Sequence, residues 1–308
     1  GFNMDCIIGL DGGGTKTLLR AVDMNKNIVC EALGGSTNLC SNSDEMVYNN
    51  LKDLFLELGD IHPIAICLGS AGISGKGSKE RLNEILFELT NCKSINVVGD
   101  METPLAAEVG SSMGVLVIAG TGAVAFGQDG MGNTARSSGW GHIIGDEGSS
   151  YWVAVQGLKA AMKGYDGRGI QTILTNLMAD AINVSPNNEI VAEIYKNYSE
   201  KSRMASLSNV VNEAAELGDT AAYAILNEAA EELLSSIDSV AKHLSIEERH
   251  FPIIISGGLL LNSRILKKLF IEKTYSKFPN AKVKQSSKDP AWGAVELAFE
   301  LLENHKKG

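Results

Sequence analysis

The chain has 308 residues, of which 44% are hydrophobic and 21% are charged, and its formal net charge is −10. This length suggests roughly two domains that can each bury a sizeable core. The acidic balance argues against nucleic acid as the main partner, because phosphate backbones select basic patches. It does not exclude phosphate compounds, which backbone amides and a divalent cation can hold.

The cysteines indicate a reducing environment. All five lie in the first third of the chain, without the CxxC spacing of a metal site: Cys6, Cys30, Cys40, Cys67 and Cys92. Their number is odd, and no secretory or membrane-spanning segment is visible. We therefore expect a cytoplasmic protein with reduced thiols, no structural metal, and neither a membrane nor a nucleic acid as partner.

The chain opens with three β-like runs, at about 5–10, 17–23 and 27–33. The polar turn "DMNKN" joins the second and third runs, which predicts an antiparallel meander. A segment of helical period follows at about 44–58, and then come the apolar run "PIAICLG", a helix "KERLNEILFEL" and a strand "SINVVG". Strands that alternate with helices predict a mainly parallel sheet with helices on its faces.

Near residue 113 the pattern starts again. The stretch "VLVIAGTGAVAFGQDGMGN" aligns with the opening stretch "IIGLDGGGTKTLLRAVDMNKN", and Thr121 then falls near Thr15. Strand, glycine turn, strand and polar hairpin recur in the same order. We interpret this as an internal duplication of two α/β halves, each of which opens with a glycine-turn hairpin.

The second half adds a long helical block at about 147–163 and 187–243. A strand "FPIIISGG", a helix "SRILKKLFIE", a strand "AKVKQ" and a final helix "PAWGAVELAFELLE" follow it. We therefore expect an N-terminal α/β domain at 1–113, on which the C-terminal helix at about 290–308 packs back. A C-terminal α/β domain with a helical insertion should occupy 114–289.

Two familiar phosphate-binding templates do not fit the glycine turns. "GTGAVA" matches the dinucleotide fingerprint, but that fingerprint must open a helix. The following "FGQDGMGN" cannot start one. "SAGISGKGS" is a near miss to the P-loop, because Ser70 stands where the first glycine belongs and Gly77 follows the lysine.

A third template accounts for both turns together. In a β-hairpin, a glycine turn can present backbone N–H groups to phosphate oxygens, and glycine lets the backbone come close and adopt positive φ. Thr15 and Thr121 can add hydroxyl donors, and Asp11 can hold a hydrated Mg²⁺. Either turn alone could be an ordinary tight turn, but the duplicated pair favours phosphate binding.

These residues also carry a family resemblance. The hairpins resemble those of the sugar kinase, actin and heat-shock ATPase superfamily. Within it, "LDGGGTKT", "GGSTN", "AGTGA" and above all "SGWGHIIGDEGSSYWVA" resemble the eukaryotic-type N-acetylglucosamine kinases and the BadF/BadG/BcrA/BcrD ATPase family that contains them. The likeness runs from Asp5 to about Leu302. It implies an α/β fold of two duplicated ribonuclease-H-like (actin-like ATPase) domains with an interdomain cleft.

The resemblance implies ATP-dependent phosphorylation of the 6-hydroxyl of an amino sugar. N-acetylglucosamine is the first candidate, and N-acetylmuramic acid, glucosamine and glucose remain open. ATP and Mg²⁺ are the implied cofactors, and we expect a homodimer. One departure bears on specificity: Leu39 and Cys40 follow "STN" where animal relatives carry a polar and aromatic pair. We therefore expect a pocket that tolerates a bulkier substituent on the sugar.

The resemblance also assigns site residues. The phosphate loops and the nucleoside end, near the segment "ELGDTAAYAIL", fall on Gly13, Gly14, Thr15, Thr121, Gly122, Gly257 and Gly258. The sugar contacts fall on Asn38, Asp100, Gly139, Gly141 and Asp146.

Asp100 is the candidate general base. It follows the strand "SINVVG", and open α/β sheets bind ligands at the carboxyl ends of their strands. A sugar hydroxyl needs a base within hydrogen-bond reach to attack a γ-phosphate. The alternative is that Asp100 is only a capping or turn residue ahead of the helix near Pro104.

Other polar residues near these motifs have competing interpretations. Asp146 could bind sugar or cap the following helix, with Glu147 as a first-turn acid. Asn38 could bind sugar or cap a helix, although Ser43 and Asp44 are better placed to cap it. His142, in the apolar context "HII", suits a structural histidine with satisfied hydrogen bonds better than a base.

Two further residues are less informative. Lys16 is expected on the strand surface and not on a phosphate, and Trp140 could equally stack on a sugar face or fill the core.

Two rival functions remain. Some relatives are ATPases that activate radical dehydratases or reductases, which requires cysteines placed to hold an iron–sulfur cluster; the early, mostly apolar positions of the cysteines disfavour this. A non-enzymatic sugar sensor should lack the base or carry a DNA-binding extension, and Asp100 disfavours that.

Overall fold

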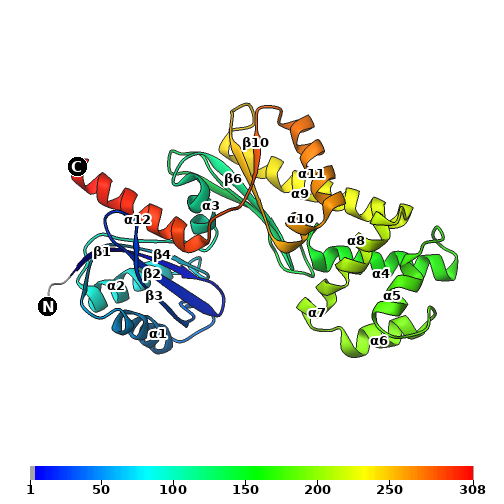
Figure 1. The fold of residues 1–308 in the computed structure, drawn as a ribbon, viewed down its shortest axis with the longest axis horizontal. Helices are drawn as coiled ribbons and strands as arrows, with labels where there is room; N and C mark the ends of the chain where they lie inside the picture. The colour runs from blue at the N-terminus through cyan, green and yellow to red at the C-terminus, as the bar shows by residue number, and fades with distance from the viewer. Residues whose placement is uncertain (1–3, 308) are drawn as a thin grey trace. The chain divides into compact units, whose positions relative to one another are not determined.

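Residues 4–307, which the computed structural model describes, divide into two units. Unit 1 combines the chain up to Ser112 with the segment from Ser287 onward, and unit 2 runs from Met113 to Ser286. Figure 1 labels the helices and strands of both units. Each unit is built on one five-stranded sheet.

The sheet of unit 1 begins with the meander expected from the sequence. Strands β1 (Met4–Gly12), β2 (Lys16–Val22) and β3 (Ile28–Gly35) pair antiparallel in turn. Strands β4 (Ile61–Ser70) and β5 (Ile95–Gly99) then add in parallel beside β1, which gives the order β3-β2-β1-β4-β5. The near-continuous burial of β1 and β4 is typical of central strands covered on both faces.

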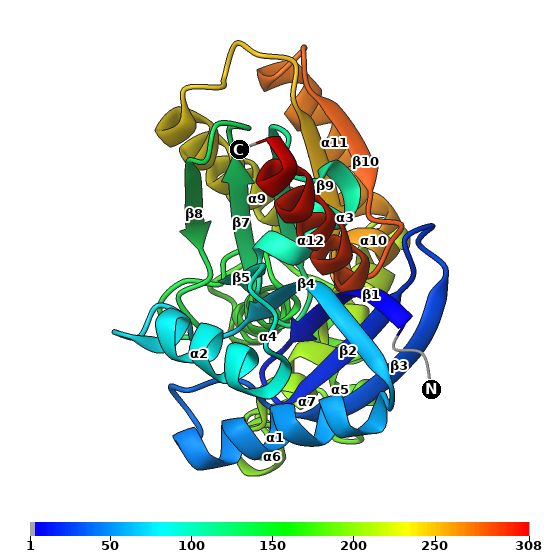
Figure 2. The ribbon, with the colours of Figure 1, turned by 90° about the vertical axis from the view of Figure 1, so that its left-hand side faces the viewer.

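The described part of unit 1 contains four helices: α1 (Asp44–Glu57), α2 (Ser78–Thr90), α3 (Glu102–Val109) and α12 (Pro290–Lys307). The N-cap of α1 is Ser43, whose side chain accepts a hydrogen bond from the first turn of the helix, as the sequence predicts. In Figure 2, α1 and α2 lie on one side of the sheet and α3 and α12 lie on the other.

The alternation of side chains along β1 separates two cores. Ile8 and Leu10 belong to the cluster that includes apolar residues of α1 and α2. Ile7 lies on the opposite face, in a cluster with Val295 and other small residues of α12. The close approach of α12 needs glycine in the strand, because a Cβ at Gly9 would lie 2.7 Å from the backbone nitrogen of Val295. Helix α12, which is far from β1 in the sequence, therefore covers part of this face of the sheet of unit 1.

The sheet of unit 2 repeats this plan. Strands β6 (Gly114–Ala119), β7 (Ala123–Gln128) and β8 (Thr134–Ser138) form the antiparallel meander, and β9 (Pro252–Ser256) and β10 (Lys282–Gln285) add in parallel. The order β10-β9-β6-β7-β8 matches that of unit 1, strand for strand. The internal duplication predicted from the sequence is therefore confirmed at the level of strand topology.

The helices of unit 2 lie mostly in one block between β8 and β9, with two more after β9. They are α4 (Ser150–Asp166), α5 (Leu174–Ala181), α6 (Glu189–Asn197), α7 (Lys201–Ser206), α8 (Ser208–Glu216), α9 (Thr220–Leu244), α10 (Gly258–Asn262) and α11 (Arg264–Lys277). Long helix α9 packs on the sheet through Ile237 and Val240, in one continuous core. Helices α5 and α10 were not expected from the sequence.

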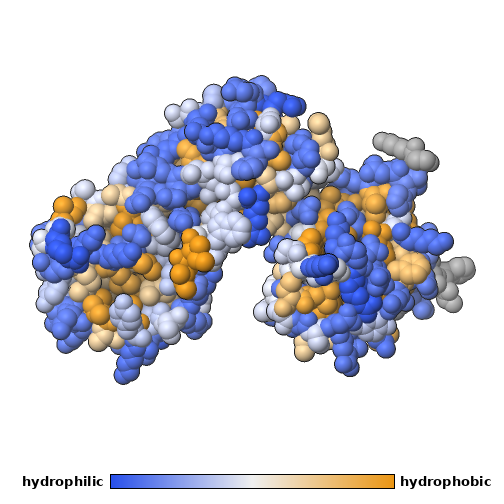
Figure 3. All heavy atoms as spheres, turned by 180° about the vertical axis from the view of Figure 1, so that it is seen from behind, coloured by the Kyte–Doolittle hydropathy of each residue, from blue (hydrophilic) through white to orange (hydrophobic). Residues whose placement is uncertain are grey.

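The surface is mostly hydrophilic with separate apolar patches, as Figure 3 shows for one face. Within residues 4–307, every helix is too short or too polar to cross a membrane.

Candidate functional site

The turn between β1 and β2 leaves three consecutive backbone amides unused. Within the described part of the chain, no hydrogen bond has the backbone N–H of Gly13, Gly14 or Thr15 as its donor. Gly14 and Thr15 are exposed, and a Cβ at Gly14 would meet nothing within 4 Å. A turn with free N–H groups and open space beside it can accept an anion.

The equivalent turn of unit 2, between β6 and β7, has the same property. Gly120 donates its N–H to the carbonyl of Gly122 at 2.9 Å, whereas the N–H groups of Thr121 and Gly122 have no acceptor among the described residues. The backbone N–H of Ser150 donates to the carbonyl of Gly120 at 2.7 Å. The first turn of α4 therefore holds this glycine turn in place.

A polar cavity of about 460 Å³ opens beside the second turn. Its lining is rich in hydroxyl and amide side chains and contains no charged residue: Gly120, Thr121, Ser150, Ser202, Ala205, Ser206, Ser208, Asn209, Asn212, Gly258, Leu259, Asn262 and Ser263. Its volume lies in the range of about 300–1,000 Å³ that is usual for small-molecule pockets. Thr121 and Gly258, which we assigned to nucleotide binding, thus line one cavity.

Gly257 explains how the strand β9 can end so close to the glycine turn. It has φ +94°, and a Cβ there would lie 2.5 Å from the carbonyl carbon and 2.8 Å from the nitrogen of Ala119. Only glycine fits this conformation and this contact. The position where Gly120 would carry a Cβ is 3.8 Å from the nitrogen of Gly258. The two glycine loops therefore lie face to face in unit 2.

In unit 1, Asp11 lies near two other carboxylates. Burial, followed by the charges of Asp289 and Asp100, raises the pKa of Asp11 above its usual value. A bound cation would relieve this repulsion, so the position of Asp11 fits a hydrated Mg²⁺ held by one carboxylate. Among the described residues, however, no three His, Cys, Asp or Glu side chains cluster as a metal cage would need.

Asp100 is exposed directly after β5 and is not a helix cap. The N-cap position of α3 is Met101, and the nearby carboxylate that binds backbone is Glu102, which accepts from the N–H of Gly99 at 2.6 Å. The capping alternative for Asp100 is therefore wrong. Its carboxylate has no hydrogen-bond donor among residues 4–307.

The segment after β3 gives Asn38 a fixed orientation. The side-chain oxygen of Asn38 accepts from the backbone N–H of Cys40 at 2.8 Å, and its amide N–H₂ donates to no described residue. Leu39 packs against the core of unit 1. Cys40 is exposed, with Sγ 3.1 Å from the carbonyl oxygen of Gly72. Of the two residues we expected to reshape the sugar pocket, Leu39 is thus half-buried and Cys40 is exposed.

The glycine-rich loop before α4 exposes apolar side chains. Trp140 is 70% exposed, Ile143 85% and Ile144 78%. His142 is also exposed, with its ring centroid 4.8 Å from that of Tyr151 at an interplanar angle of 65°. The expectation of a satisfied structural histidine is therefore wrong, because His142 is exposed and has no hydrogen-bond partner among the described residues. The core alternative for Trp140 is excluded as well.

Asp146 lies under the second glycine turn and not at a helix end. The N-cap of α4 is Ser149, so Asp146 is not the cap and Glu147 is outside the first turn. The buried carboxylate of Asp146 accepts weakly from the N–H of Ala123 at 3.4 Å and lies 3.6 Å from Nζ of Lys201.

Residues 8–298 match the BadF/BadG/BcrA/BcrD ATPase family. The chain belongs to this family. A Clostridium acetobutylicum relative named N-acetylmuramic acid/N-acetylglucosamine kinase is 35% identical over 301 residues, which cover 96% of this chain and 98% of the relative. The N-acetyl-D-glucosamine kinase of Dictyostelium discoideum is 30% identical over 317 residues, with the same two coverages.

Solved structures support the fold of this family member. A Chromobacterium violaceum protein has a TM-score of 0.68 at 24% identity, covering 96% of this chain and 99% of its own. The ROK hexokinase of Thermus thermophilus has a TM-score of 0.59 at 14% identity, with coverages of 98% and 99%. At such identities the likeness establishes only the fold, which is the duplicated ribonuclease-H-like α/β fold expected from the sequence.

Sequence reasoning missed part of the polar cavity. The helical block does line it, but through residues 202–212 of α7 and α8 and not through the segment 216–226 that contains "ELGDTAAYAIL". A signal was present, because Ser202 and Ser206 recur at helical spacing and so share one face of α7. Lys201 was also missed, since its partner Asp146 is remote in the sequence.

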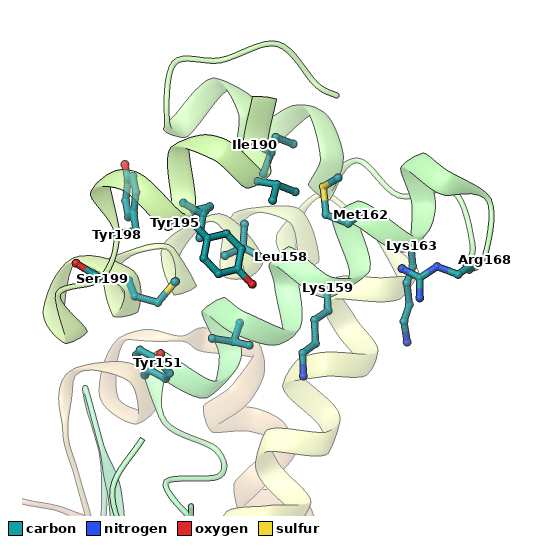
Figure 4. A pocket seen from close by; sticks show the side chains of 14 residues that line it. Tyr151, Leu158, Lys159, Met162, Lys163, Arg168, Ile190, Tyr195, Tyr198 and Ser199 are labelled. Carbon is teal, nitrogen blue, oxygen red and sulfur yellow. The ribbon is translucent and has the colours of Figure 1, made fainter. Parts of the chain in front are cut away.

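A second cavity of the same unit, about 770 Å³, differs in character (Figure 4). Leu158, Ile190 and Tyr195 give it a mainly apolar lining between α4 and α6, with Lys159 and Lys163 along α4. It lacks the glycine turns and the hydroxyl-rich lining of the polar cavity. The polar cavity is therefore the better candidate for a nucleotide.

Proposed function

We propose that this family member is an ATP-dependent kinase that phosphorylates the 6-hydroxyl of N-acetylglucosamine and of N-acetylmuramic acid. The observation that carries the proposal is that both glycine turns present unused backbone N–H groups, one beside Asp11 and Asp100 and the other at a polar cavity. The two relatives at 30–35% identity, both named as amino-sugar kinases, support the substrate class.

The nucleotide is assigned to the polar cavity of unit 2. Its phosphates accept from the free N–H groups and hydroxyl at Thr121 and Gly122, and its nucleoside end lies along Gly257 and Gly258. The turn at Gly13, Gly14 and Thr15 supplies further donors to the terminal phosphates. Fixed backbone dipoles of this kind stabilise the charge that develops in phosphoryl transfer.

Asp100 is the general base of the proposed reaction. Its carboxylate takes the proton of the sugar's 6-hydroxyl as that oxygen bonds to the γ-phosphorus, while the bond from the γ-phosphorus to the bridging β,γ-oxygen breaks and ADP leaves. An exposed carboxylate without a donor of its own is free to accept this proton.

Asp11 is the residue that would hold Mg²⁺ through its water shell. When bound, the cation neutralises phosphate charge and aligns the terminal phosphates. The raised pKa of Asp11, caused by burial and by Asp289 and Asp100, supports this assignment because a nearby cation would offset both effects.

The sugar is assigned to Asn38, Asp100, Gly139, Gly141 and Asp146. The free amide of Asn38 and the carboxylates can bind hydroxyls, and the positive φ values of Gly139 and Gly141, +75° and +94°, shape the loop beside Trp140. We assign the tolerance for the lactyl group of N-acetylmuramic acid to Leu39 and Cys40, which follow Asn38 in the sequence.

We also propose that the reaction takes place in the cytoplasm. All five cysteines of the chain are free. This state fits a compartment that keeps thiols reduced.

The test is steady-state kinetics of Asp100→Asn with the two amino sugars and Mg-ATP. General base catalysis typically contributes about 10²–10⁴-fold, so kcat should fall by roughly that factor. The dissociation constant of ATP should change little, because Asp100 is assigned to the sugar. Asp60→Asn is the matched control. Asp60 is also an exposed aspartate, but it precedes the first residue of β4, whereas Asp100 follows the last residue of β5.

Two results would contradict the proposal at different levels. A wild-type chain that forms no ADP in response to either sugar would refute the kinase assignment itself. An Asp100→Asn variant that keeps more than about a tenth of the wild-type kcat would leave the kinase but remove Asp100 as its base.

A further inference from the structure

Lys201 lies near the second glycine turn, Gly120–Gly122, but it belongs to α7 and not to α4, whose first residue bonds to that turn. It is the first residue of α7, and its Nζ lies 3.6 Å from Oδ2 of Asp146. That same Oδ2 lies 3.2 Å from the point where Gly122 would carry a Cβ. The ammonium group of Lys201 therefore lies at most about 7 Å from the Cβ position of Gly122, in the turn whose N–H groups are unused.

The contact with Asp146 does not commit Lys201 to a structural role. At 3.6 Å the two groups are farther apart than the 2.7–3.2 Å of a good hydrogen bond, and the lysine side chain is 42% exposed. A loose and partly exposed ion pair contributes little to stability. The flexible stem of lysine also lets its three donors move to another anion nearby.

The polar cavity needs a cation that its own walls lack. Its lining residues are all uncharged, yet a triphosphate brings several negative charges. Ser202, the residue after Lys201, belongs to that lining. Lys201 can therefore bring positive charge to the phosphate turn from beside the cavity, because its ammonium group already lies against Asp146 next to that turn.

We propose that Lys201 is a further catalytic residue of the kinase reaction. Its ammonium group contacts the γ-phosphate at the Gly120–Gly122 turn and stabilises the negative charge on the phosphoryl oxygens during transfer. No proton moves to or from Lys201; the 6-hydroxyl proton goes to Asp100, as proposed above. The inference rests on the proposed function, and it assigns Asp146 a second task as the group that keeps Lys201 beside the turn.

The decisive variant is Lys201→Met, which keeps the length of the side chain and removes its charge. Removing one preorganised donor of this kind costs about 10²–10³-fold in kcat, so we expect a loss of that size with the KM for sugar within about twofold. Lys201→Arg, which retains a charge on a side chain of different shape, should recover part of the loss. Lys196→Met, at an exposed lysine in the last turn of α6, is the matched control and should behave as wild type.

Nucleotide binding gives a readout that does not depend on turnover. A charged hydrogen bond to the γ-phosphate is worth about 1.5–3 kcal/mol, so Lys201→Met should weaken ATP binding by about tenfold or more. ADP lacks the γ-phosphate, so its dissociation constant should stay within about twofold. This comparison of ATP and ADP binding tests Lys201 even if the wild-type chain shows no sugar-dependent turnover. Absence of turnover would refute only the proposed function.

Two outcomes would overturn the inference. If Lys201→Met raises the KM for sugar and leaves kcat and ATP binding unchanged, Lys201 acts only by positioning Asp146. If ATP and ADP binding weaken equally, the lysine does not contact the γ-phosphate.

Discussion

Replacing Gly257 by alanine should disrupt unit 2 and its polar cavity together. The φ of +94° and ψ of +145° lie in a region that residues with a Cβ rarely adopt, and holding one there costs about 1–3 kcal/mol. The new Cβ would also press on the backbone of Ala119, at 2.5 Å from its carbonyl carbon, which no side-chain rotation can relieve. Overpacking of this kind costs a further 1–3 kcal/mol or so. Gly257→Ala should thus lower the free energy of unfolding by about 2–6 kcal/mol.

Gly132→Ala is the control for this prediction. Gly132 has nearly the same φ, +95°, in the β7–β8 hairpin, but a Cβ there would meet nothing within 4 Å. Both variants change the unfolded chain in the same way, so the difference between them reports the contact with Ala119 together with the difference in backbone strain between the two positions. Urea unfolding followed by circular dichroism gives both free energies, and ATP titration should show weaker binding for Gly257→Ala alone. If the two variants are equally stable, the steric argument fails.

Two further predictions concern the carboxylates of unit 1. The folded-state pKa of Asp11 is raised, so its charge costs stability at neutral pH; without divalent cations, Asp11→Asn should raise the free energy of unfolding at pH 7. Urea titrations should show this gain shrinking as the pH falls through the raised pKa, and a gain independent of pH would contradict the assignment. The pKa of Asp289 is lowered, first by its hydrogen bond from Arg20 at 2.6 Å, so its contribution is present at neutral pH and lost in acid. Because Arg20 is only 5% exposed, Asp289→Asn should lower the free energy of unfolding at pH 7 by about 1–3 kcal/mol. Unchanged stability at pH 7 would show that Glu31, 3.5 Å from Arg20, is a sufficient partner for the buried guanidinium.

Local pattern predicted much of the fold. The opening strands lie within two or three residues of the predicted limits, because apolar runs bounded by "DGGGT" and "DMNKN" leave few alternatives. The duplication was readable for the same reason, since turn chemistry recurred at Thr15 and Thr121. Helix starts were less certain: α4 begins at Ser150 and not near 147, because Gly148 adopts φ +88° and Ser149 provides the cap.

The features that the sequence did not predict depend on which way individual side chains point. Ile143 and Ile144 look like core residues in the sequence, yet they face solvent, and the adjacent His142 is exposed as well. The pairing of Lys201 with Asp146 joins a loop to a helix across a long stretch of chain, and no local pattern encodes such a contact.

The discontinuous composition of unit 1 has a consequence for biosynthesis. Its strands leave the ribosome first, but the helix α12 that covers Ile7 and its neighbours emerges only after the whole of unit 2. A nascent chain that has not yet reached Pro290 therefore carries a sheet with the α12 part of one apolar face uncovered, whereas the uninterrupted unit 2 already has all the residues of its core. Exposed apolar surface of this kind attracts chaperones and promotes aggregation. Synthesis of this chain should thus depend on holding its earliest segment soluble until its latest one arrives.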